Sequence, residues 1–179
     1  QWSGNLNFLE KETIELPDPN TLWHNIAVNN NVFYVEISLP NNTSDQYYYN
    51  NIMNSTFESA PIYPNTFALW FQTNNGVINT LNQISESSWE FFDNNGNSIY
   101  ASGDLIANTQ YRDTLTFNSG CYVFKVTDTD DDGIDFWANN DGGGMARFRE
   151  IGASWLKSFD GDFGRSIHHQ FRIENTTNT

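Results

Sequence analysis

Alternating apolar and polar residues dominate the chain, whereas stripes with helical spacing are nearly absent. Alternation over a short run is typical of strands with one buried face. The segments with this pattern are residues 33–39, 66–73, 88–93, 97–101, 111–117, 121–127, 145–151, 154–159 and 167–174, with weaker runs near 5–9 and 23–28. They predict about eight to ten strands. The fold they favour is all-β, an antiparallel β-sandwich of jelly-roll type.

Turn residues predict how some of these strands are joined. The Asn-Asn-Gly turn at 94–96 and the Asn-Ser-Gly turn at 118–120 each predict a hairpin between the strands that flank them. The stretch 41–64 is polar and tyrosine-rich and contains two prolines, so it is expected to be a long loop or linker. We therefore expect an N-terminal section, 1–64, whose strands and polar loop pack on or precede the core, and a β-sandwich module, 65–179.

Composition and charge narrow the function. Aromatic residues make up 16% of the 179 residues, and 22 Asp and Glu against 8 Lys and Arg give a net charge of −14. Such a surface repels nucleic acids and anionic lipid, and no apolar run is long enough for a membrane span. No basic segment precedes an apolar one, so any signal peptide is expected to have been removed. The single cysteine, Cys121, excludes an internal disulfide and is expected to be a buried strand thiol.

The run D-T-D-D-D-G-I-D is the most informative motif. It places Asp128, Asp130 and Asp132 at alternate positions before Gly133, so that these carboxylates and the carbonyl of Ile134 can converge on one calcium ion. Further ligands are expected from Asp135 and Asp141, with Asn140 or the loop 160–162 as other sources. The motif differs from an EF-hand because position 12 is an asparagine and flanking helices are absent. A solvated acidic turn is the alternative, and calcium in such a fold is expected to be mainly structural.

Aromatic and polar residues after this loop suggest a binding site. Trp137 is expected to present an exposed ring to a sugar, with Asn139 and Asn140 hydrogen-bonding to its hydroxyl groups. Arg147 shares a strand face with Arg149 and could grip a carboxylate, although a solvated strand face explains both equally well. The tyrosines at 47–49 form a second possible platform. Core packing is the alternative for each aromatic residue.

Catalysis finds little support in the sequence. It contains no H-E-x-x-H zinc motif, no G-x-S-x-G elbow and no glycine-rich phosphate loop. The adjacent His168 and His169 fall in one predicted strand and should point to opposite faces, which argues against a shared metal or proton relay. Acidic residues are so abundant that a pair suited to glycoside hydrolysis has no predictive value.

Several spaced segments resemble a known type of module. They are S-E-S-S-W-E-F-F-D-N-N-G-N-S-I-Y, T-Q-Y-R-D-T-L-T-F-N-S-G-C-Y-V-F-K-V-T-D and D-D-D-G-I-D-F-W-A-N-N-D-G-G-G. In this order they are similar to an accessory module of secreted Bacteroidetes proteins that lies beside peptidases and peptide-N-glycosidase F-like enzymes, often upstream of a type 9 secretion sorting domain. The resemblance covers about residues 66–173. It implies an accessory β-sandwich on an exported or cell-surface protein, although a second cysteine near the loop is absent here.

These observations together predict a non-catalytic, secreted, calcium-binding β-sandwich. Its expected partners are a glycan or another extracellular polymer, as in adhesion, and the neighbouring domains of a larger protein, without nucleic acid or membrane insertion. The alternative is a purely structural spacer of a larger hydrolase or adhesin.

Overall fold

The computed structural model describes residues 11, 13, 30–38 and 43–174. The chain divides into two compact units, residues 1–59 and 60–179. The weak strands predicted near 5–9 and 23–28 lie outside the described residues.

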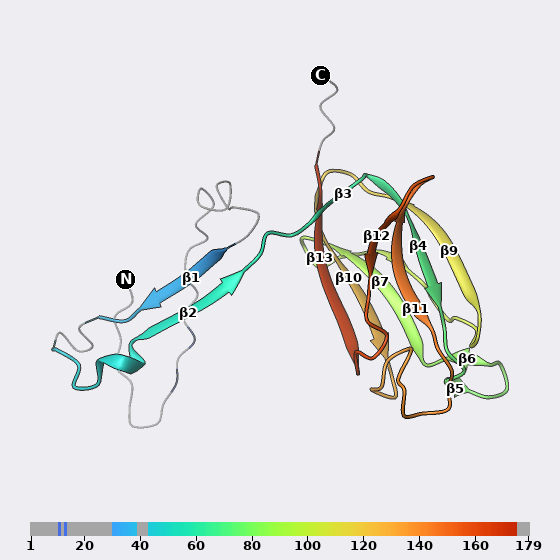
Figure 1. The fold of residues 1–179 in the computed structure, drawn as a ribbon, viewed down its shortest axis with the longest axis horizontal. Coiled ribbons are helices and arrows are strands. Elements are labelled where there is room, and N and C mark those ends of the chain that lie inside the picture. Colours follow the sequence, from blue (N-terminus) through green and yellow to red (C-terminus); the bar gives the residue numbers. More distant parts are fainter. Residues whose placement is uncertain (1–10, 12, 14–29, 39–42, 175–179) are drawn as a thin grey trace, which may run out of the picture. The chain divides into compact units, whose positions relative to one another are not determined.

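The first unit contains a two-stranded antiparallel sheet. Strand β1 (Asn31–Glu36) pairs with β2 (Ile52–Phe57), and a short 3-10 helix, η2 (Tyr48–Asn50), precedes β2 (Figure 1). The prediction of a loop or linker over 41–64 is therefore wrong at β2. This strand has four exposed residues between two half-buried ones, so backbone pairing with β1 rather than one buried face holds it, and its sequence carries no alternation.

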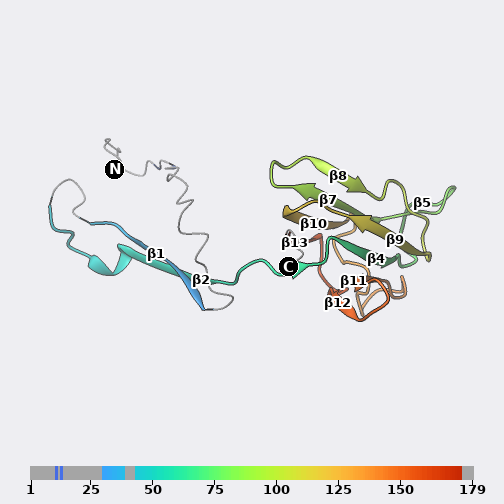
Figure 2. The ribbon, with the colours of Figure 1, turned by 90° about the horizontal axis from the view of Figure 1, so that it is seen from above.

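The second unit consists of two sheets that face each other. In one view they lie as separate layers, with β7 and β8 in one and β4, β9 and β11 in the other (Figure 2). The five-stranded sheet contains, in spatial order, β3 (Ile62–Tyr63), β13 (Ser166–Ile173), β10 (Gly120–Asp128), β7 (Ser87–Asp93) and β8 (Ser98–Ala101). The four-stranded sheet contains β12 (Trp155–Ser158), β11 (Met145–Glu150), β4 (Thr66–Gln72) and β9 (Gln110–Thr116). A small ribbon of β5 (Val77–Asn79) and β6 (Ile84–Ser85) lies apart from both. The all-β, predominantly antiparallel sandwich is confirmed, and its jelly-roll connectivity stays a prediction.

The core between the sheets is built mainly of phenylalanine. Phe67 on the four-stranded sheet lies 6.4 Å, ring centre to ring centre, from Phe91 on the opposite sheet and 5.8 Å from Phe171, and all three are fully buried. Residues at every second position of β4 and β10 point into this core, which is the physical basis of the alternation in the sequence. Aromatic ring pairs in such tilted and edge-to-face arrangements add to the stabilisation from burial.

One predicted hairpin is confirmed and the other is wrong. Strands β7 and β8 pair across the turn at 94–96. The turn at 118–120 instead carries the chain from one sheet to the other, because β9 pairs with β4 whereas β10 pairs with β7 and β13. Phe117 therefore packs on Tyr122 of β10, with ring centres 5.0 Å apart, and both flanking segments bury one face in the core without pairing with each other.

The boundary between the two units lies after Ser59, and the sequence places it after Pro64. The difference arises because the short strand β3 pairs in parallel with β13 and so belongs to the sandwich. Within the described residues, no helix is long and apolar enough to cross a membrane.

Candidate metal centre at the acidic loop

The acidic loop, residues 129–144, connects β10 to β11 at the end of the sandwich where β5 and β6 lie (Figure 1). Backbone hydrogen bonds fix it to two neighbouring segments. The amide of Asn75, just after β4, donates to the carbonyl of Asp141 at 2.6 Å, and the amide of Ile134 donates to the carbonyl of Gly161 at 2.9 Å. The loop is therefore attached to the rest of the domain by backbone hydrogen bonds on two sides.

Three carboxylates gather at the base of this loop. Oxygen atoms of Glu86, Asp128 and Asp132 all lie within 4.8 Å of one another, and the residues Glu86 and Asp128 are only 4% and 1% exposed. Buried carboxylates of like charge at this separation repel one another strongly unless a proton or a cation compensates them. This group of side chains could hold a metal ion.

Asp128 is fixed by hydrogen bonds from three directions. Its Oδ1 accepts from the hydroxyl of Ser87 at 2.9 Å, and its Oδ2 accepts from the amides of Asp132 and Gly133, both at 3.2 Å. Accepting these two amides turns the loop back on itself, and Gly133 completes the turn with a φ of +87°. The pKa of Asp128 is nevertheless raised, because burial outweighs the three hydrogen bonds.

Glu86 reaches the group from the short segment between β6 and β7. Its Oε1 accepts a hydrogen bond of 3.0 Å from the side-chain amide of Asn74, whose own oxygen accepts from the amide of Gly76. A Cβ atom at position 76 would overlap the Glu86 carboxylate, so a glycine there makes room for the charge. Burial, assisted by the charges of the loop aspartates, raises the pKa of Glu86 to about 7 against the effect of Asn74.

Asp132 supplies the observation that most directly indicates a ligand. Its Oδ2 accepts a 2.6 Å hydrogen bond from the side-chain amide of Asn139, but its Oδ1 is buried and has no hydrogen-bond partner among the residues that the structure describes. Buried carboxylate oxygens are normally paired or bound to a cation. The three carboxylates are hard oxygen donors, which suit Ca²⁺ or Mg²⁺ rather than soft metals.

The structure brings together two of the six predicted calcium ligands, Asp128 and Asp132. Asp130 and Asp135 are exposed and lie outside the group of three.

The remaining predicted ligands act through the backbone. The carbonyl of Ile134 accepts a hydrogen bond from the amide of Gly144, and the Ile134 side chain is fully buried in the core. Asp141 contributes through its backbone, since its amide donates to Asn139 Oδ1 and its carbonyl accepts from Asn75. Of the other two predicted sources, Asn140 is exposed, and the loop 160–162 contacts the acidic loop through the backbone of Gly161.

The predicted ligand-binding residues fall into separate places. Trp137 is 85% exposed and Asn140 is also exposed, as a binding role requires. Asn139 is directed into the loop, where it holds Asp132. Arg147 lies on the outer face of the four-stranded sheet, with its guanidinium carbon 5.3 Å from the ring centre of Trp155.

Glu86 is the member of the centre that the sequence did not single out. It stands alone between two serines and shows no motif spacing. The signal that could have found it is strand pairing, because Ser87 lies opposite Asp128 in the register of β7 and β10. Pairing these two predicted strands places the residue before β7 beside the end of β10.

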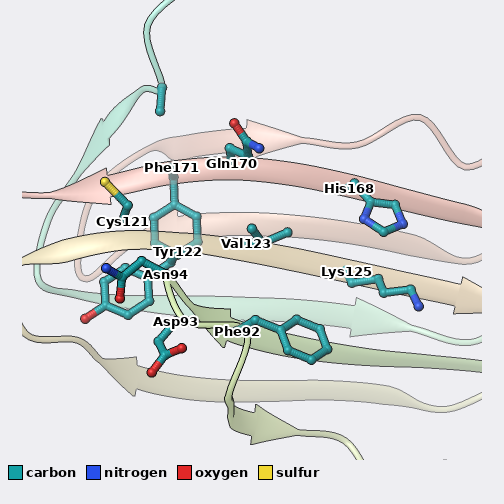
Figure 3. A pocket seen from close by; sticks show the side chains of 12 residues that line it. Phe92, Asp93, Asn94, Cys121, Tyr122, Val123, Lys125, His168, Gln170 and Phe171 are labelled. Carbon is teal, nitrogen blue, oxygen red and sulfur yellow. The ribbon is translucent and has the colours of Figure 1, made fainter. Parts of the chain in front are cut away.

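A mainly apolar groove of about 610 Å³ lies on the outer face of the five-stranded sheet (Figure 3). Phe92 and Val123 line its centre, and Cys121 is exposed at its edge, so the prediction of a buried thiol is wrong. The reason is register, since Tyr122 and Phe124 take the inward positions of β10. Cys121 pairs with Arg172 and lies four residues along the strand from the position opposite His168, which keeps the thiol and imidazole at opposite ends of the groove (Figure 3).

Comparison of the chain with models of protein families, with curated proteins and with solved structures gave no match.

Proposed function

We propose that residues 60–179 form a non-catalytic, calcium-stabilised β-sandwich of a secreted or cell-surface protein, and that this module binds a glycan or another extracellular target. The calcium part rests on one observation, the buried and unpartnered Oδ1 of Asp132 beside the buried carboxylates of Glu86 and Asp128. Ca²⁺ is the ion proposed because it binds carboxylate oxygens in flexible geometry, whereas Mg²⁺ demands a near-ideal octahedron.

The burial of these groups indicates a structural role for the ion. A cation held by Glu86 and Asp128 lies beneath the loop and joins three segments: the start of β7, the end of β10 and the loop itself. It is therefore not positioned to share its coordination with a sugar. Its effect is to hold the loop in the conformation that presents Trp137.

Calcium titration of the metal-free chain tests this part of the proposal. We expect the melting temperature to rise with calcium and to fall again in chelator, and we expect Asp132→Asn to abolish most of this response. Asp130→Asn, which removes the same charge from an exposed position of the same loop, is the matched control and should respond as the wild type does. A melting temperature that is indifferent to calcium, or an equal response in the two variants, would contradict the proposal.

The binding part is supported by Trp137, a large aromatic side chain left 85% exposed beside polar loop residues. A glycan array run with calcium and with chelator should give hits that are lost in Trp137→Ala while the fold is retained. Leu81→Ala is a suitable control because Leu81 is 92% exposed on a different loop. Binding that survives in Trp137→Ala would exclude this residue as the contact.

A second candidate, a spacer domain without a ligand, is favoured by one observation. Asn139, one of the residues expected to face a sugar, instead donates its amide to Asp132 within the loop. Calcium-dependent stability combined with a silent array would support the spacer. The resemblance to accessory modules of exported Bacteroidetes proteins suits both candidates.

A further inference from the structure

Arginine and tryptophan side chains gather on the outer face of the four-stranded sheet. In β4, Phe67, Leu69 and Phe71 point into the core, so Trp70 between them points outward. The strand register places Arg112 of β9 and Arg147 of β11 on either side of Trp70. Arg149 and Trp155 lie in the adjacent row. We refer to Trp70, Arg112, Arg147, Arg149 and Trp155 as the Arg–Trp face.

Ring stacking holds the three guanidinium groups in place. The guanidinium carbon of Arg112 lies 3.8 Å from the ring centre of Trp70, and that of Arg149 lies 5.2 Å from Trp70 and 5.3 Å from Trp155. Arg147 lies 5.3 Å from Trp155, and the two indole rings meet edge to face at 5.2 Å. Stacking of this kind orders a guanidinium without using its N–H donors.

These three cations have no carboxylate partner among the described residues. The ion pairs there are Arg165 with Asp131 and Arg172 with Glu174. On the face itself, Arg112 donates to the side chain of Gln110 and Arg149 donates to the carbonyl of Ala153, whereas Arg147 makes no hydrogen bond to a described residue. In a chain with 22 acidic and 8 basic residues, three arginines without an ion-pair partner in the described ranges thus lie together on one surface. Most of their donors are free to bind an anion.

We propose that the Arg–Trp face binds a polysaccharide that carries carboxylate groups, such as a polyuronate. This inference rests on the proposed binding of a glycan by the module, and it adds a ligand class and a second surface that is separate from Trp137. The planar guanidinium fork matches a carboxylate in a bidentate manner. Trp155, which is 42% exposed, offers its ring to the apolar C–H surface of a sugar.

The charge of the whole chain distinguishes this ligand from a nucleic acid. Double-stranded DNA carries a charge about every 1.7 Å, and a protein of net charge −14 repels such a polymer over any long contact. A polyuronate carries at most one charge per sugar. Arg112 and Arg147 are two strand spacings apart, about 10 Å, so they can reach charges on different sugars of one chain. Outward threonines, Thr114 and Thr116, extend the polar surface along β9.

Binding to polygalacturonate tests the proposal, with its methyl ester as the uncharged control polymer. The intact chain is loaded with calcium and then desalted, because free calcium gels the polymer. We expect binding to polygalacturonate that weakens with added salt, and much weaker binding to the methyl ester. Arg147→Gln and Arg112→Gln should each weaken binding by about tenfold. Arg172→Gln, an equal charge change on the other sheet, should leave it unchanged.

Several outcomes would overturn the inference. These are equal affinity in all three arginine variants, equal or stronger binding to dextran sulfate, polyglutamate or single-stranded DNA, and no binding to polygalacturonate. If another glycan binds and is lost only in Trp137→Ala, the proposed function stands and the Arg–Trp face is excluded. Circular dichroism of each variant separates lost binding from lost folding. Trp155→Ala provides a second variant, in which weaker binding to polygalacturonate is expected without any change of charge.

Discussion

Replacing Glu86 by Gln should stabilise the metal-free protein at pH 8 and at the same time weaken its response to calcium. Glu86 is 4% exposed, and burial raises its pKa from 4.5 to about 7. Because the pKa in the folded state is higher than in the unfolded state, the contribution to stability is full below pH 4.5 and is lost as the pH rises through 7. From that difference in pKa, the wild type loses about 3 kcal/mol of free energy of unfolding when Glu86 ionises. The variant does not lose it, because Gln is neutral and nearly isosteric with Glu.

The measurement is chemical denaturation of the wild type and Glu86→Gln, in chelator and in calcium, at pH 5 and pH 8. In chelator the two proteins should have similar free energies of unfolding at pH 5. At pH 8 the variant should be more stable by about 3 kcal/mol, or roughly 10 °C in melting temperature. In calcium the order should reverse, because the ion stabilises the carboxylate and binds the variant more weakly.

Other titrating groups also change the free energy of unfolding with pH, but their contribution cancels in the difference between the two proteins because both contain them. Asp130→Asn provides the control for a loss of loop charge, and it should show neither the gain at pH 8 nor the weakened calcium response. A Glu86→Gln variant that is less stable than the wild type in chelator at pH 8 would refute the reasoning. That result would mean that contacts within the protein stabilise the carboxylate even when no cation is bound.

Three further predictions concern the candidate metal centre and the core of the sandwich. Gly76→Ala should destabilise the sandwich and lower its affinity for calcium in a titration, because the added Cβ overlaps the Glu86 carboxylate; unchanged affinity would contradict this. Burial lowers the pKa of His169 to about 4, so the stability it contributes is present above pH 6.5 and is lost as the pH falls toward 4. Taken as the difference between Glu86→Gln and the double variant Glu86→Gln/His169→Gln, in which the other titrating groups cancel, this loss should approach about 3 kcal/mol by denaturation; a difference that does not change with pH would contradict the burial of this imidazole. Phe67→Ala should cost about 3–5 kcal/mol in free energy of unfolding, whereas Leu81→Ala should cost less than about 0.5 kcal/mol; equal losses would contradict the assignment of the core.

The strands of the sandwich could be predicted because burial is one-sided. Phe67, Leu69 and Phe71 alternate with outward residues, and this repeat survives without any knowledge of the partners. The same pattern does not predict which of the two sheets a strand belongs to. The turn at 118–120 looks like a hairpin in sequence, yet it crosses between the sheets, because Phe117 and Phe124 satisfy the core equally well from opposite sides. The strand β2 was missed because its side chains are mostly exposed.

The acidic loop was predicted as a cation site, but most of its ligand set was not. Alternate positions converge in an EF-hand loop, whereas here Asp132 donates its amide to Asp128 and the chain folds back within four residues. Asp131 adopts a φ of +65° and pairs with Arg165, and Asp130 is exposed. Local spacing therefore does not determine which carboxylates meet. The third member, Glu86, joins the group only through the pairing of β7 with β10.

The two charged features of the sandwich are segregated, and this separation has a functional consequence. The carboxylates of the candidate metal centre are buried where β10 ends, whereas the guanidiniums of the Arg–Trp face are held by indole rings on the outside of β4, β9, β11 and β12. The phenylalanine core lies between the two sheets, on the opposite side of the four-stranded sheet from the Arg–Trp face. Loss of the ion therefore acts on the Arg–Trp face only through the stability of the domain, while it acts on Trp137 directly through the conformation of the loop. Calcium dependence of binding is thus the property that assigns a ligand to one surface or the other.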